Sequence, residues 1–142
     1  MQFRRAAKVR YMSWKKKQTR KYKPRNEFRR NGSPLAENHP HYIFGEINGK
    51  YKSLGLTRNP VDGIRHVKLV KNPNLNSSDT SYLQMRVHTA KKKYYGPLLK
   101  DWEFSQDDMP VVRNTIKKYK KSINRKPKLW YEKKRKQNKN KN

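Results

Sequence analysis

The pattern that determines the fold lies in residues 42–57, which read YIFGEINGKYKSLGLT. Residues 42–47 are β-branched or aromatic apart from one Gly and one Glu, and residues 50–57 alternate polar with apolar side chains; both patterns are typical of β-strands. Between them lies Asn48-Gly49, the pair that best suits the two-residue turn of a β-hairpin. We therefore predict a β-hairpin over these residues.

Three further stretches are predicted to form strands. Residues 64–70 and 82–88 place apolar side chains at strand spacing, and a last strand is expected around Tyr94 and Tyr95. Turn-forming residues separate them, above all the Asn- and Ser-rich stretch 72–79. These connections are too short for crossover helices, so the sheet should be antiparallel.

One helix is predicted after the sheet. Asp107 and Asp108 supply capping side chains and negative charge for a helix N-terminus, and Pro110 is tolerated only in the first turn, so the helix should begin at Asp107 or Asp108. The residues expected to face the sheet recur at steps of three and four: Met109, Val112, Ile116, Tyr119 and Ile123. The predicted fold class is α+β, a small antiparallel sheet of the hairpin plus two or three strands, packed by one C-terminal helix.

The chain is strongly basic, and most of the excess charge lies outside its centre. Its 142 residues include 38 Lys plus Arg and 10 Asp plus Glu, a formal net charge of +28. Residues 1–38 hold 13 basic and 2 acidic groups, residues 39–112 hold 11 and 7, and residues 113–142 hold 14 and 1. The flanks therefore carry the charge and the centre resembles an ordinary domain.

This distribution predicts three parts. Residues 1–38 form a basic N-terminal arm that contains aromatic residues, residues 39–123 form the α+β domain, and residues 124–142 form a basic C-terminal tail. Both arms have the composition of disordered segments, because they contain too few apolar residues to form a core. We expect the domain to fold without them and the arms to supply most of the affinity for a ligand.

Several classes of protein are excluded by composition. The chain contains no Cys, which excludes disulfides, thiolate metal sites and a Cys nucleophile and favours a reducing, cytoplasmic setting. It contains no apolar run of the length that crosses a bilayer and no phosphate-binding GxxxxGK[ST] loop. His39 and His41 share a strand-like spacing, but no Cys or nearby carboxylate completes a metal site. No metal or cofactor is expected.

Nucleic acid is the expected partner, since a cation excess of this size calls for a polyanion. In the first arm, Arg and Lys alternate with aromatic residues, a combination that neutralises phosphates and stacks on unpaired bases, which favours RNA over DNA. The expected contact residues are Arg4, Arg5, Arg10, Tyr11, Trp14, Lys15, Lys16, Lys17, Arg20, Tyr22, Arg29, Arg30, Arg65, Arg86, Lys91, Lys92, Lys93, Lys117, Lys118 and Lys121.

Two alternatives remain open at this stage. A metal-independent ribonuclease or toxin-like enzyme needs a base, an acid and a cation, and the centre offers the candidate catalytic residues His41, His66 and His88 with Arg65 and Arg86 as phosphate clamps. In a protein that only binds, the same side chains would simply contact phosphate or base. The second alternative is a partnership with an acidic protein or an anionic membrane surface.

Residues 41–108 resemble a known group of sequences. The stretches YIFGEINGKYKSLGLT, KLVKNPN, SYLQMRV and LLKDWEFSQDDM are similar to those of uncharacterised small basic proteins from low-GC bacterial genomes and mobile elements. The resemblance covers about half of the chain and implies no established activity. The expected setting is a ribonucleoprotein or a mobile-element nucleoprotein complex.

Overall fold

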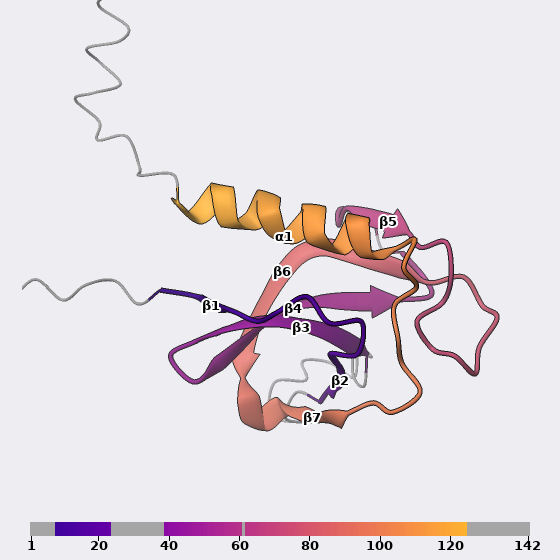
Figure 1. Ribbon diagram of the computed structural model, residues 1–142, viewed down its shortest axis with the longest axis horizontal. Coiled ribbons are helices and arrows are strands. Elements are labelled where there is room, and N and C mark those ends of the chain that lie inside the picture. The colour runs from indigo at the N-terminus through magenta and orange to yellow at the C-terminus, as the bar shows by residue number, and fades with distance from the viewer. Residues whose placement is uncertain (1–7, 24–38, 61, 125–142) are drawn as a thin grey trace, which may run out of the picture.

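A computed structural model describes residues 8–23, 39–60 and 62–124 (Figure 1). In this part of the chain, seven strands form one antiparallel sheet and a single α-helix, α1 (Met109–Asn124), lies across one of its faces. The strands are β1 (Arg10–Tyr11), β2 (Thr19–Tyr22), β3 (Pro40–Ile47), β4 (Lys50–Thr57), β5 (His66–Lys68), β6 (Tyr82–Lys91) and β7 (Tyr95–Leu98). The predicted fold class is confirmed.

The predicted hairpin is formed by β3 and β4. Ile47 pairs with Lys50, so Asn48 and Gly49 are the two turn residues. Their φ angles are 51° and 75°, and such a turn with two positive φ values matches the twist of the strands on either side. Asn and Gly are the residues that adopt this conformation at least cost, which explains why the hairpin is visible in the sequence.

The sheet is curled, because its strand order is β5-β6-β4-β3-β2-β7 and β6 is joined to β7 by only three residues. The connection is a short 3-10 turn, Lys92–Tyr94, which spans at most about 10 Å, so the chain must bring the far edge of the sheet round to the end of β6. Figure 1 shows β6 bending towards β7. Irregular pairing within β3, β4 and β2 supplies local bends of the kind that β-bulges introduce.

Residues 10–11 and 19–22 belong to the sheet, although we expected all of residues 1–38 to lie outside the domain. β1 pairs with β3, and β2 lies between β3 and β7. The Met12 amide donates to the Phe44 carbonyl at 2.9 Å, and the Ile43 amide donates to the Gln18 carbonyl at 2.9 Å. A domain cut at residue 39 would therefore lose two strands.

The physical reason is that β1 and β2 take their conformation from their partners. The β2 sequence, TRKY, shows no run of apolar side chains, and a strand of two to four residues is fixed by ladder hydrogen bonds and packing rather than by its own preference. Gly45 helps β1 to approach, because a Cβ at that position would lie only 3.1 Å from the Arg10 carbonyl oxygen. The predicted contacts Arg4, Arg5, Arg29 and Arg30, and residues 125–142 of the predicted tail, lie outside the described residues.

The core lies between α1 and the sheet. Its fully buried residues are Tyr42, Phe44, Leu54, Leu56, Leu69, Leu83, Phe104, Met109, Val112 and Ile116. Tyr119 also packs against this core, with its ring 5.8 Å from that of Phe44. The expectation that Ile123 faces the sheet is wrong: it is 45% exposed, because the core ends at Tyr119 along the helix.

Asp108 joins the start of α1 to the segment that follows β5. Its carbonyl oxygen accepts the Val112 amide, and the helix begins at Met109, one residue after the later of the two predicted starts, Asp107 and Asp108. Its carboxylate is 1% exposed and accepts the amides of Val70 at 2.7 Å and Lys71 at 3.0 Å, as well as the Ser105 hydroxyl at 3.0 Å. One buried side chain thus fixes the position of the helix relative to the sheet.

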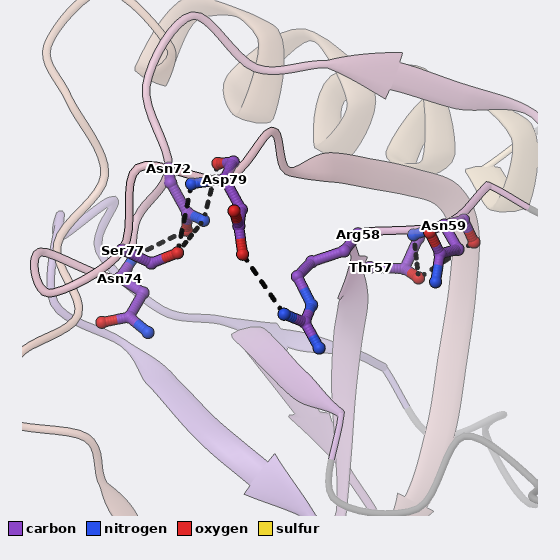
Figure 2. A network of polar contacts seen from close by, with 7 residues as sticks. All are labelled: Thr57, Arg58, Asn59, Asn72, Asn74, Ser77 and Asp79. Atoms are coloured by element: carbon purple, nitrogen blue, oxygen red, sulfur yellow. Dashed lines mark hydrogen bonds and ion pairs between the residues drawn. The ribbon is translucent and has the colours of Figure 1, made fainter.

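The polar connection between β5 and β6 is held by its own side chains (Figure 2). The backbone amide of Asn74 donates to Asn72 Oδ1 at 2.9 Å, and Asn72 Nδ2 donates to the backbone carbonyl of Asp79 at 2.9 Å. The backbone amide of Asp79 donates to Ser77 Oγ at 3.2 Å. Arg58 and Asp79 form an ion pair at 3.2 Å, but both side chains are more than half exposed, so the pair adds little stability.

Candidate nucleic-acid interface

A groove lies between residues 11–14 and α1. It encloses about 370 Å³, and the helix contributes Ile116, Lys117 and Lys120 to its walls. The segment is held at both ends, since the Met12 amide binds the Phe44 carbonyl and the Tyr42 hydroxyl donates to the Lys15 carbonyl at 2.8 Å. We call this the basic–aromatic groove.

Cations of α1 lie over the aromatic rings of the groove. Arg113 Cζ is 5.3 Å and Lys117 Nζ is 5.5 Å from the centre of the Trp14 ring, and Lys120 Nζ is 5.0 Å from the centre of the Tyr11 ring. These distances are typical of cation–π contacts. Such contacts orient the side chains while their charge remains available to an anion.

The charge of the groove is not balanced by acids. None of the residues that line it is acidic, and Arg113, Lys117 and Lys120 form no ion pair with any other described residue. Trp14 is 39% exposed, and Lys15, Lys16 and Lys17, which follow it, are exposed. The surface therefore offers a partly open aromatic ring among uncompensated cations.

The structure brings together most of the predicted contact residues of the first arm and the helix. Arg10, Tyr11, Trp14 and Lys15–Lys17 lie on or beside the segment that borders α1, and Lys117, Lys118 and Lys121 are on exposed positions of the helix. Sequence reasoning missed Arg113 and Lys120 as contact residues. Their spacing of four and three residues around Lys117 places all three on one helix face, which is the signal that could have identified them.

Four other predicted contacts have structural partners elsewhere. Arg20 Nη1 donates to the Gly96 carbonyl at 2.9 Å and lies over Tyr51, so it links β2 to β7. Lys92 binds Glu46 at 2.7 Å, and this hydrogen bond lowers the pKa of the Glu46 carboxyl. Lys93 lies over Tyr94, and Tyr22 packs among other rings. Lys91 is exposed at the end of β6.

Two of the three candidate catalytic histidines meet in a cluster of rings. The centroids of His41 and His88 are 5.2 Å apart, and Tyr22 lies 5.1 Å from His41 and 4.6 Å from His88. Ser53 Oγ lies 3.0 Å from both His41 Nδ1 and the Tyr95 hydroxyl. These residues come from β2, β3, β4, β6 and β7, so the cluster holds the curled sheet together. We call it the histidine cluster.

The third candidate, His66, lies apart on β5, where it pairs with Gln84 and makes no ring contact with the other two within the described part of the chain. The Nε2 atoms of His66 and His88 are buried without a hydrogen-bond partner. Among the residues that the structure describes, no three or more His, Cys, Asp or Glu side chains lie together so that they could hold a metal ion.

His41 is unsuited to acid–base catalysis. It is 4% exposed, and burial, reinforced by His88 and His39, lowers its pKa to about 3. Burial and then Arg86 also lower the pKa of His88. A general base works best when its pKa lies near the operating pH, and it must reach its substrate. At neutral pH His41 is a neutral, enclosed ring whose hydrogen bond to Ser53 explains its position.

The histidine cluster should make the fold sensitive to acid. Because the pKa of His41 is about 3 in the folded chain and about 6.5 when exposed, only the unfolded chain takes up this proton as the pH falls below 6.5. The stability that depends on His41 is therefore fully present above about pH 6.5 and decreases as the pH falls below that value. Between pH 7 and pH 5 we expect a loss of about 2 kcal/mol from His41, and His88 acts in the same direction.

Urea unfolding in high salt at pH 7, 6 and 5 measures this loss. In His41→Gln, whose amide can still bind Ser53, the difference between pH 7 and pH 5 should shrink by about 2 kcal/mol. An unchanged difference would mean that His41 is not the group that titrates.

Comparison with known proteins found no matching family model, curated protein or solved structure. Within the described residues, no helix combines the length and the apolar character required to cross a membrane.

Proposed function

We propose that the protein binds single-stranded RNA through the basic–aromatic groove and the cations around it. The observation that carries this proposal is the stack of Arg113, Lys117 and Lys120 on the rings of Trp14 and Tyr11. Uncompensated cations repel one another, and phosphates relieve that repulsion while releasing counterions. The chain as a whole carries a net charge of +28, so the groove is part of a strongly attractive field for polyanions.

RNA with unpaired bases is favoured over duplex DNA because of the aromatic residues. Trp14 presents a partly exposed ring beside Lys15–Lys17, and a base can stack on such a ring while its phosphates meet the lysines. A duplex keeps its bases stacked and would use only the charges. A cytoplasmic ribonucleoprotein or a mobile-element nucleoprotein complex is the setting that fits this chemistry.

The ribonuclease alternative gains no support from the histidine cluster. His41 is enclosed, its pKa is far below neutral, and His66 is not part of the cluster. The residues of the cluster are accounted for by packing between β2, β3, β4, β6 and β7. We therefore propose binding without cleavage.

A salt titration tests the proposal. We expect the affinity for a fluorescent 12-nucleotide RNA, followed by anisotropy, to fall with a log–log slope of about −4 to −7, as six to ten phosphate contacts on a single strand predict. The RNA recovered afterwards should be intact on a denaturing gel. A slope near zero would contradict phosphate contact as the main interaction, and shortened RNA would restore the ribonuclease alternative.

A further inference from the structure

A second cavity lies on the other side of α1, between the helix and β6. Its volume is about 550 Å³, which is within the range of ligand pockets, about 300–1,000 Å³. The helix contributes Thr115, Lys118, Tyr119 and Ser122 to its walls. The basic–aromatic groove uses Ile116, Lys117 and Lys120, so α1 separates the two sites.

The floor of this cavity is apolar and held by backbone bonds. Ile64, Met85 and Val87 line it together with the Tyr119 ring. The Met85 amide donates to the Arg65 carbonyl at 2.9 Å, which ties the floor to the segment before β5. Most of the other walls come from β6 and α1, and side chains on such elements are held more precisely than side chains on loops.

The rim of the cavity is cationic. Arg65 lies just before β5, Arg86 is on β6 and Lys118 is on α1; all three are exposed, and none forms an ion pair with another described residue. No acid is among the lining residues. An apolar floor with positive charge around it matches a flat, weakly polar ring that carries negative groups beside it.

We infer that this cavity receives one unpaired base of the bound RNA, whose neighbouring phosphates contact Arg65, Arg86 and Lys118. The inference rests on the proposed function and adds the part of the RNA that the cavity recognises. Lys117 borders the groove and Lys118 borders the cavity, so the cations are continuous across α1. A strand that leaves the groove across the helix meets the cavity next. An acidic peptide would satisfy the rim but leave the apolar floor empty.

Two probes of equal charge separate the base from the phosphates. One is a fluorescent 12-nucleotide oligouridine and the other is a 12-residue abasic ribose-phosphate chain. The parent protein should bind the base-containing probe about tenfold more tightly, as one or two stacked bases predict. A 12-residue oligoglutamate serves as the acidic-peptide probe and should bind more weakly than either.

The variant Ser122→Trp closes the cavity without changing its charge. Ser122 is exposed, so the substitution leaves the core intact. Its matched control is Asn114→Trp, which places the same ring on an exposed position of α1 that lines neither site. We expect Ser122→Trp to weaken oligouridine binding about tenfold and to leave the binding of the abasic chain unchanged. Asn114→Trp should bind oligouridine as the parent does.

The outcomes are distinct. If the parent binds neither nucleic-acid probe, the proposed function fails and this inference fails with it. If the parent binds both probes equally, no base stacks in the cavity or on Trp14, and only the phosphate contacts of the proposed function stand. If the two Trp variants behave alike, RNA binding stands and the base site in the cavity is overturned. Equal losses on both probes in Ser122→Trp would assign the cavity to phosphate rather than base. Oligoglutamate binding as tight as that of RNA would assign it to an acidic protein.

Discussion

Asp108→Ala should lower the free energy of unfolding by about 4 kcal/mol. The carboxylate is buried and accepts the amides of Val70 and Lys71 and the hydroxyl of Ser105. Alanine leaves these three donors without their charged acceptor, and a hydrogen bond to a charged group contributes about 1.5–3 kcal/mol. A small domain has only about 5–15 kcal/mol of stability, so the variant should be unfolded or close to it at 37 °C.

Urea unfolding followed by circular dichroism, in high salt to keep nucleic acid away, measures this effect. Asp108→Asn retains one acceptor oxygen and should lose about half as much. The matched control is Asp107→Ala, an exposed neighbour, which should change stability by less than about 0.5 kcal/mol. Equal losses of stability at positions 107 and 108 would show that negative charge at the helix N-terminus stabilises the fold and that the hydrogen bonds of the Asp108 carboxylate do not.

The triple variant Arg113→Gln, Lys117→Gln and Lys120→Gln should bind single-stranded RNA with a salt dependence that is shallower by about 2 in log–log slope. Each phosphate contact on a single strand contributes about 0.7 to that slope, so three lost contacts remove about 2. The affinity itself should fall by at least tenfold at low salt, because the lost charges are those over Trp14 and Tyr11.

A second triple variant controls for net charge. Lys68, Lys71 and Lys100 are exposed and line neither the basic–aromatic groove nor the cavity beside β6, so changing them to Gln removes the same charge from elsewhere. The salt slope of this variant should differ from that of the parent by less than half as much as the slope of the groove variant does. If both triple variants weaken binding equally, RNA follows the overall charge of the protein and the groove has no special role.

The hairpin, the helix and the antiparallel class could be predicted because local chemistry determines them. Asn48-Gly49 fits one type of turn, and Pro110 with Asp108 fits one place for a helix to begin. β1 and β2 could not be predicted, because their positions depend on β3 and β7, which are distant in the sequence. Residues 10–22 look like a basic arm until those partners are known.

Only part of the candidate site could be predicted, because residue types can be read from the sequence and distant contacts cannot. The sequence identifies the aromatic rings of the first arm and the cations of the helix. That residues 11–14 lie beside α1 depends on the fold. His41 was a candidate for contact with RNA because of its residue type, and it lies on the opposite face of β3 from the core residues Tyr42 and Phe44. The curl of the sheet buries that second face as well, so one face holds the core and the other holds the histidine cluster.

The position of β2 between β3 and β7 also determines the order in which the protein can fold during synthesis. Arg20 and its partner Gly96 are separated by 76 residues, and a ribosome that adds about 5–20 residues per second needs roughly 4–15 s to make that length. Contacts between residues so distant in the chain form slowly even in a complete polypeptide. Pairing of β2 with β7 is therefore a late step, and for those seconds Arg20 is without its Gly96 partner while the chain lies beside ribosomal RNA. Nascent chains thus meet a competing polyanion before their own sheet can close.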